Sequence, residues 1–168
     1  MPVLNLPSEV EAVFREFRTG ELTTIAKDGT PVTWPLVVMY HPEEGRFIAA
    51  TSIGLANKVY HVRRNPHVSV LFSEPKASGL TNPPAVLVQG DAEAPDEITS
   101  AKGLEDYWRT IFQRQPSSKD MSRTALNRYL VDWYYMRIRI LIKPRRISWW
   151  PAGDFSQPAQ QIEVNHVG

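Results

Sequence analysis

Lys58 and its neighbours are the side chains in this sequence best suited to binding a small anion. Asn57 and Lys58 open a predicted helix, and Thr51 and Ser52 end the strand predicted before it. A cation near a helix N-terminus adds its charge to N–H groups that have no partner within the helix, and together they suit a phosphate dianion. The two hydroxyls can donate to the same group. The alternative is that Lys58 is a solvated lysine on the helix surface.

Other kinds of chemistry find little support. The chain has no cysteine, which excludes thiolate metal sites, iron–sulfur clusters and cysteine nucleophiles. Its four histidines show neither His-x-x-x-His spacing nor a carboxylate at ligand spacing, so we expect no metal site. Gly-x-Ser-x-Gly and the glycine-rich loops of nucleotide-binding folds are absent too. No side chain is an obvious general acid or base, so the candidates are binding residues and the catalytic residues stay unassigned.

Composition points to one ordinary domain. The chain has 168 residues, of which 42% are hydrophobic and 22% charged, and this fits a single compact core. Nineteen Lys and Arg against 18 Asp and Glu give a formal net charge of +1, which disfavours nucleic acid as a partner. No stretch approaches about 18 uninterrupted apolar residues, and the first residues lack the basic start of a signal peptide. We therefore expect a soluble, cytoplasmic protein without a membrane partner.

Periodicity and turn signals divide the chain into strands and helices. Apolar residues at helical spacing predict helices over 8–20, 54–65, 96–112 and 121–133. Alternating residues predict strands over 22–26, 32–40, 46–50, 67–72, 85–92, 134–142 and 145–149. Six or so strands in meander order with these helices indicate an α+β fold, a six-stranded antiparallel split β-barrel with flanking helices. Residues 1–150 form the single domain, and 151–168 form a loose C-terminal tail.

A basic stripe runs along the last predicted strands. Strand alternation divides its residues between two faces, and several acidic residues are available as counter-charges. We therefore expect solvated faces there, with Arg139 in an interface groove as the alternative. The basic residues are Arg137, Arg139, Lys143, Arg145 and Arg146, and the acidic ones are Asp91, Glu93, Asp96 and Glu97.

Four short segments resemble a known family. They are Ala50-Thr51-Ser52, Asn57-Lys58, Val62 to Phe72 and Val86 to Glu93. In element order over about residues 10–150 the chain resembles the split-barrel flavin-binding superfamily of pyridoxamine phosphate oxidase, including its flavin and deazaflavin oxidoreductases. The resemblance implies a homodimer that holds FMN, or in some relatives the deazaflavin F420, in grooves between the subunits. It places Lys58 where the family has a phosphate-binding Lys or Arg.

The resemblance also implies roles for residues outside the Lys58 segment. Relatives contact the flavin ring with the backbone of the strand that here holds Thr33, Trp34 and Pro35, and Trp34 is expected either against that ring or at the dimer interface. Trp149 and Trp150 face opposite ways on one strand, so one is expected to reach the partner subunit's cofactor and the other the core. The candidate cofactor-binding set is Thr33, Trp34, Pro35, Ala50, Thr51, Ser52, Asn57, Lys58, Arg63, Arg64, Trp149 and Trp150. For Arg63 and Arg64 the alternative is a surface charge at the helix C-terminus.

Departures from the family pattern bear on the substrate. Pyridoxamine phosphate oxidase presents an Arg and a Lys where this chain has Trp34 and Met39, and an Arg/His-bearing C-terminal segment where it has residues 148–154. We therefore expect a substrate other than pyridoxamine phosphate. The predicted function is an FMN-binding oxidoreductase that passes a hydride through the flavin to a small molecule. The alternatives are an F420-dependent reductase of the same fold, and a non-catalytic flavin- or haem-binding protein.

Overall fold

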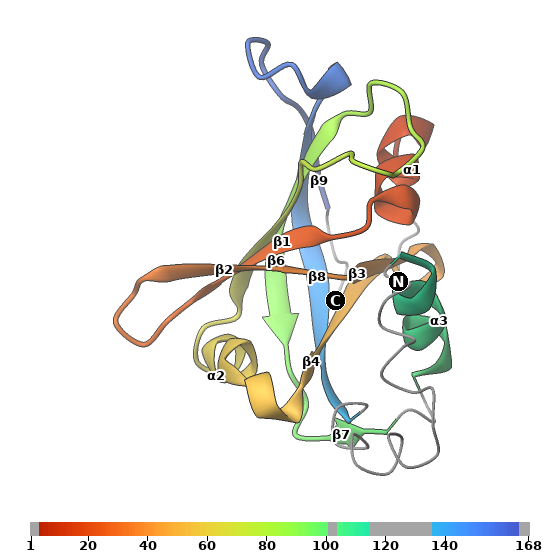
Figure 1. Cartoon of the computed structure of the whole chain (residues 1–168). Helices are drawn as coiled ribbons and strands as arrows, with labels where there is room; N and C mark the ends of the chain where they lie inside the picture. The colour runs from red at the N-terminus through yellow and green to blue at the C-terminus, as the bar shows by residue number, and fades with distance from the viewer. Residues whose placement is uncertain (1–3, 101–103, 115–135, 165–168) are drawn as a thin grey trace.

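The chain folds into one curled antiparallel sheet with helices beside it (Figure 1). The structure, a computed structural model, describes residues 4–100, 104–114 and 136–164. The sheet has the order β2-β1-β5-β6-β8-β4-β3, and β7 and β9 each pair with β8. This half-barrel confirms the predicted α+β class. Among the described residues no helix has the length and apolarity needed to span a membrane.

The element bounds are as follows. The helices are α1 (Ser8–Glu16), α2 (Asn57–Arg64) and α3 (Glu105–Arg114), and the short 3-10 turns are η1 (Pro42–Glu44), η2 (Ile53–Leu55) and η4 (Pro151–Gly153). The strands are β1 (Gly20–Ile25), β2 (Pro31–Leu36), β3 (Val38–His41), β4 (Arg46–Ser52), β5 (His67–Phe72), β6 (Ala85–Glu93), β7 (Ile98–Thr99), β8 (Arg137–Trp150) and β9 (Gln160–Glu163).

The curl of the sheet explains one difference from the sequence prediction. The run predicted as a single strand over 32–40 breaks at Val37 into β2 and β3. Among the described strands β2 pairs with β1 alone and β3 with β4 alone, so the two halves lie at opposite edges of the sheet. One continuous apolar run therefore connects both edges, which curls the sheet toward a barrel.

A β-bulge explains a second difference. Pro144 was expected to separate two strands, but β8 runs unbroken through it from Arg137 to Trp150. The register of β6 against β8 shifts between Gln89 and Gly90, and a bulge accommodates a residue that lacks an N–H donor. A Cβ on Gly90 would lie 2.2 Å from the Lys143 carbonyl oxygen, so only glycine permits this close approach of the two strands.

The core lies between the concave face of the sheet and α1. Phe14 of α1 packs against Phe47 with ring centroids 4.8 Å apart and against Phe72 at 5.2 Å. Burying one such side chain contributes about 1.5–3 kcal/mol. A second apolar cluster lies under α3, where Trp108 and Ile111 cover Ala50 and Val37.

The C-terminal third departs most from the predicted elements. The helix expected from Asp96 begins only at Glu105, and Ile98 and Thr99 form β7 instead. The helix predicted over 121–133 lies outside the described residues. The tail is not loose over 160–163, because β9 pairs with β8 from Arg146 to Trp149.

Candidate functional site

Lys58 is buried at the start of α2, with 8% of its surface exposed. Its Nζ donates to Thr51 Oγ1 at 3.0 Å and to the Leu55 carbonyl at 3.3 Å, while Thr51 Oγ1 donates to the same carbonyl at 2.9 Å. The ammonium also lies 5.1 Å from the centroid of the Trp34 ring. Lys58 is therefore not a solvated helix lysine.

The local sequence dictates this burial. β4 ends at Ser52, η2 turns the chain, and α2 begins at Asn57, so the first turn of the helix folds back over the end of the strand. Val59 and Val62 are buried on the same helix, which fixes its rotation against the sheet. Within the residues that the structure describes, no side chain caps the N-terminus of α2. Its first N–H groups and Lys58 thus add positive potential at one place.

No carboxylate among the described residues forms an ion pair with Lys58. Burial, and secondarily the charge of Arg137, lowers the pKa of Lys58. Desolvation of an unpaired cation has this effect because the charged form loses hydration. An anion bound at Lys58 would reverse that effect.

Arg137 is the site residue that the sequence prediction missed. It was expected on a solvated face, but only 5% of it is exposed, and its guanidinium carbon lies 4.7 Å from the centroid of the Trp108 ring. Arg137 pairs in register with Ser52 at the end of β4. The buried Ser52 Oγ has no hydrogen-bond partner in the part of the chain that the structure describes. Arg137 and the Ser52 hydroxyl thus lie beside the end of β4, and the charge of Arg137 is near enough to act on Lys58.

His61 joins the site one helical turn after Lys58. Its ring lies 5.6 Å from the Trp34 ring, and its Nδ1 is 3.0 Å from the Oγ1 of Thr24, which is fully buried. Burial and the nearby Arg64 lower the pKa of His61, with Asp28 opposing them. His61 was not among the predicted cofactor-binding residues, although i and i+3 positions share a helix face and its spacing from Lys58 could have indicated it.

Other predicted site residues lie apart from this cluster. Thr33 and Pro35 are exposed on the opposite face of β2, and Thr33 Oγ1 lies 2.8 Å from Thr23 Oγ1. Asn57 is exposed at the helix start and Arg64 at its end.

Arg63 is engaged elsewhere. Its guanidinium donates to the carbonyls of Ala94 and Pro95 at 3.0 and 2.9 Å and pairs with Asp96 at 3.2 Å. These contacts attach the end of α2 to the segment after β6. They agree with the alternative that Arg63 is a charged residue at the helix C-terminus and not a cofactor ligand.

Ala50 and the two tryptophans also have other surroundings. Ala50 lies under α3, where its carbonyl accepts a hydrogen bond from the Tyr107 hydroxyl at 3.1 Å. Trp149 belongs to the core, as expected for one of the pair, and Trp150 contacts Phe155 at 5.1 Å between ring centroids. Both tryptophans lie at the end of β8 away from Arg137. Of the predicted set, the structure brings together Trp34, Thr51, Ser52 and Lys58.

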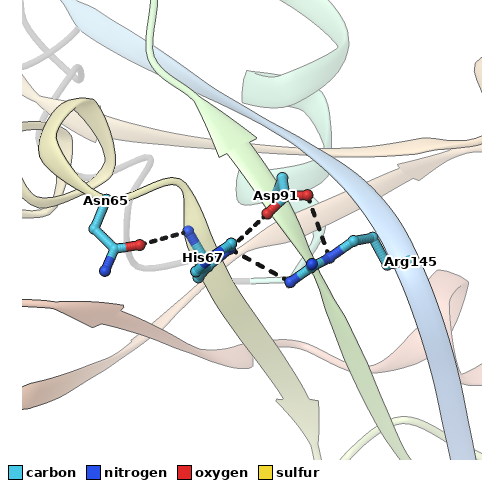
Figure 2. A network of polar contacts seen from close by, with 4 residues as sticks. All are labelled: Asn65, His67, Asp91 and Arg145. Carbon is cyan, nitrogen blue, oxygen red and sulfur yellow. Dashed lines mark hydrogen bonds and ion pairs between the residues drawn. The ribbon is translucent and has the colours of Figure 1, made fainter. Parts of the chain in front are cut away.

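A second polar cluster lies just beyond the end of α2 (Figure 2). Asn65 Oδ1 accepts from the His67 N–H at 3.0 Å, and His67 Nδ1 lies 2.7 Å from Asp91 Oδ1. Arg145 reaches Asp91 Oδ2 with Nε at 3.2 Å. This confirms that acidic residues compensate the basic stripe at Arg145. The charges of this cluster are paired, so it offers no comparable anion site.

One set of side chains could surround a metal ion among the described residues. Ligand atoms of His41, Glu43 and Glu44 lie within 4.8 Å of one another at the exposed turn η1. Glu44 already forms an ion pair with Arg46, which competes with a metal for that carboxylate. The Lys58 cluster remains the better-formed site, and its buried cation and unused hydroxyl fit a phosphate group.

Comparisons with known proteins agree with this description. The family model for pyridoxamine 5'-phosphate oxidase matches residues 6–137. No curated protein matches the chain. A conserved hypothetical protein from Mycobacterium tuberculosis is 23% identical with a TM-score of 0.61, and the match covers 99% of this chain and 97% of that one.

Two further solved structures share the fold. An F420 reductase is 19% identical over 85% of this chain and 98% of its own, with a TM-score of 0.58. A pyridoxamine 5'-phosphate oxidase-related FMN-binding protein from Nostoc punctiforme is 14% identical over 96% and 99%, with a TM-score of 0.57. At these identities the likeness establishes the fold alone. Because the family model spans most of the chain, the protein belongs to the pyridoxamine 5'-phosphate oxidase family.

Proposed function

We propose that this protein binds FMN, with F420 as the alternative cofactor, by its phosphate at Lys58, and works as an oxidoreductase on a small molecule. The observation that carries the proposal is the buried Lys58 ammonium, which has no carboxylate partner among the described residues. When bound, such a cofactor supplies hydride chemistry that no side chain of the chain provides.

The residues of the site divide the work of holding a phosphate. Lys58 Nζ supplies a point charge, and the first N–H groups of α2, which no described side chain caps, supply directed donors. Ser52 Oγ, which has no partner among the described residues, supplies a further donor. Thr51 keeps the ammonium in place through its hydroxyl. Arg137 adds positive potential from the start of β8, which favours a dianion over a neutral ligand.

Trp34 and His61 border the site and orient its contents. Lys58 and His61 of α2 both contact the Trp34 ring, and these two contacts restrain its indole. His61 is restrained in turn by Thr24. A restrained aromatic side chain beside a phosphate site provides an apolar surface for a planar ring at low entropic cost.

We extend the proposal to a homodimer with the cofactor between subunits. β2, which carries Trp34, is an edge strand with one unpaired side, so a second chain can approach the site there. Sedimentation over a range of concentrations tests this arrangement. A monomer at all concentrations would contradict the shared site without affecting the phosphate contact of Lys58.

The test of cofactor binding compares Lys58→Ala with Lys27→Ala, an exposed lysine in the β1–β2 turn. The wild-type protein is titrated with FMN and with F420, and binding is followed by fluorescence. Loss of Lys58 should weaken binding by about 1.5–3 kcal/mol, the range for a hydrogen bond to a charged group. Lys27→Ala should bind like the wild type. Equal affinity of the two variants would remove Lys58 from the site.

The visible absorption spectrum of the purified protein distinguishes the alternatives. A flavin spectrum, or tight binding of FMN alone, supports the FMN proposal, and tight binding of F420 alone selects the reductase alternative. A haem spectrum without binding of FMN or F420 would overturn the FMN proposal and the F420 alternative, and it would support a haem-binding protein.

A further inference from the structure

A pocket lies at the end of the sheet away from α2. It has a volume of about 690 Å³ and is formed between the loop over residues 73–84 and η4. Figure 1 shows both segments at the opposite end of the sheet from α2. β5 joins the two regions, since it starts just after α2 and its six residues span roughly 20 Å. Ligand pockets commonly enclose about 300–1,000 Å³, so this one suits a small organic molecule.

The lining of this pocket mixes apolar and polar groups, and its charges cancel. Phe17 and Leu80 contribute to it, and Phe155 stands at its edge with 62% of its surface exposed. Glu74 and Lys76 are the charged residues that line it, one of each sign. The Lys58 site, by contrast, concentrates positive charge. The pocket therefore favours a neutral ligand over an anion.

The backbone around the pocket is strained. Three non-glycine residues in the described part of the chain have positive φ: Ala77 at 59°, Asn82 at 47° and Ala152 at 52°. All three lie in the two segments that form the pocket, and Asn82 and Ala152 line it. Unfavourable backbone conformations persist where surrounding structure fixes them, and they gather at ligand sites.

An exposed aromatic ring completes the arrangement. Phe155 is held against Trp150, with ring centroids 5.1 Å apart, although most of the phenyl ring faces water. A planar apolar ligand would cover that ring and remove it from water. Asn82 lines the same pocket and offers an amide that both donates and accepts hydrogen bonds.

We propose that this pocket binds a neutral, planar compound that combines an apolar ring with a polar group. Phe155 provides the stacking surface, and Asn82 pairs with the polar group. The inference goes beyond the cofactor proposal and does not depend on it.

The experiment uses a matched pair of probes on the full chain. Naphthalene-2-sulfonamide is neutral, and naphthalene-2-sulfonate is its anionic counterpart of almost the same shape. Calorimetric titration should show the sulfonamide binding at least about tenfold more tightly than the sulfonate. Tighter binding of the sulfonate would overturn the proposal, because it would indicate an anion site.

Three variants locate the binding. Phe155→Ala should weaken sulfonamide binding about tenfold, while Ile98→Ala, which removes a side chain that is 58% exposed on β7, should leave it unchanged. Because Phe155 is exposed, its removal should not unfold the protein, and circular dichroism checks this. Lys58→Ala should bind the sulfonamide like the wild type, which separates this test from that of the cofactor. Unchanged affinity in Phe155→Ala would overturn the proposal.

Discussion

The two ends of α2 carry positive charge in opposite ways. At the N-terminal end, Lys58 is buried and, within the described part of the chain, donates hydrogen bonds to a hydroxyl and a carbonyl and to no carboxylate. Just past the C-terminal end, Arg145 and His67 share the carboxylate of Asp91 in an exposed network. The helix dipole favours cations at the C-terminal end and opposes them at the N-terminal end. The cation that Asp91 compensates therefore lies where the helix dipole already favours positive charge, and Lys58, which has no carboxylate partner among the described residues, lies where the dipole opposes it.

This difference indicates what each end does. Exposed ion pairs contribute little to stability, so the network beyond α2 costs little to form and little to lose. A buried cation at a helix N-terminus is costly unless an anion joins it. Since the chain supplies no carboxylate to Lys58 among its described residues, we infer that the compensation comes from a ligand.

The largest expected loss of stability comes from the β-bulge that supports the exposed network of Asp91 and Arg145. Gly90→Ala would put a Cβ 2.2 Å from the Lys143 carbonyl oxygen, and the nearest atoms that this Cβ would meet all belong to the backbone. The bulge that presents Arg145 beside Asp91 cannot adjust without separating β6 from β8. We expect a loss of about 3 kcal/mol in the free energy of unfolding, at the upper end for overpacking. Urea denaturation measures it.

Gly79→Asn is the matched control for that substitution. Gly79 has φ of 78° with nothing within 4 Å of its Cβ position, and asparagine tolerates the left-handed region. Its effect should be well below that of Gly90→Ala. Equal losses would mean that the close strand approach at Gly90 is not what stabilises the bulge.

The next effect concerns the N-terminal end of α2. A ligand that binds only the native state raises stability by about 2.7 kcal/mol at a concentration of 100 times its Kd. FMN should therefore raise the thermal midpoint of the wild type, and at the same concentration it should raise that of Lys58→Met clearly less. An equal rise of the thermal midpoint in both proteins would mean that FMN does not compensate the charge of Lys58 at the N-terminal end of α2.

Sequence reasoning predicted much of the fold because the elements concerned are local. The Asp28-Gly29 step marks the β1–β2 hairpin, and Asn65-Pro66 ends α2. Lys58 was found for the same reason, since its position at a helix start is readable from the sequence around it.

Other features depended on contacts between distant segments. Pro144 was read as a strand break because the bulge that accommodates it is created by Gly90 on another strand. Arg137 was read as solvated because its burial depends on Trp108 of α3, almost thirty positions earlier. The apolar run over 32–40 breaks at Val37 because its second half pairs at the far edge of the sheet, and no local pattern reveals this.

A smaller effect tests the cost of the buried charge directly. In the absence of ligand, Lys58→Met should raise the free energy of unfolding by about 1 kcal/mol, because an apolar side chain of similar length replaces an uncompensated buried cation. Thr51 keeps its hydrogen bond to the Leu55 carbonyl in this variant. A loss of the same size would show that the hydrogen bonds of Lys58 outweigh its desolvation.

Removing a cation from the exposed network should matter less. Arg145→Met should lower the free energy of unfolding by less than about 1 kcal/mol, since Arg145 and Asp91 are both well exposed. High salt should abolish the difference because it screens exposed charges. Denaturation at low and at about 1 M salt checks this. A larger loss that persists in high salt would place this pair in a structural role.

The smallest effect is a pH dependence at His61. Burial and Arg64 hold the pKa of His61 below its ordinary value of 6.5, so the unfolded chain binds this proton more readily than the folded one. The free energy of unfolding should therefore fall as pH drops below 6.5 and through the lowered pKa. His61→Asn can keep a partner for Thr24 but cannot take up the proton, so its stability should fall less over the same range. Denaturation of both proteins between about pH 7 and 5 measures the difference, and identical slopes would mean that burial and Arg64 do not hold the pKa of His61 below its ordinary value.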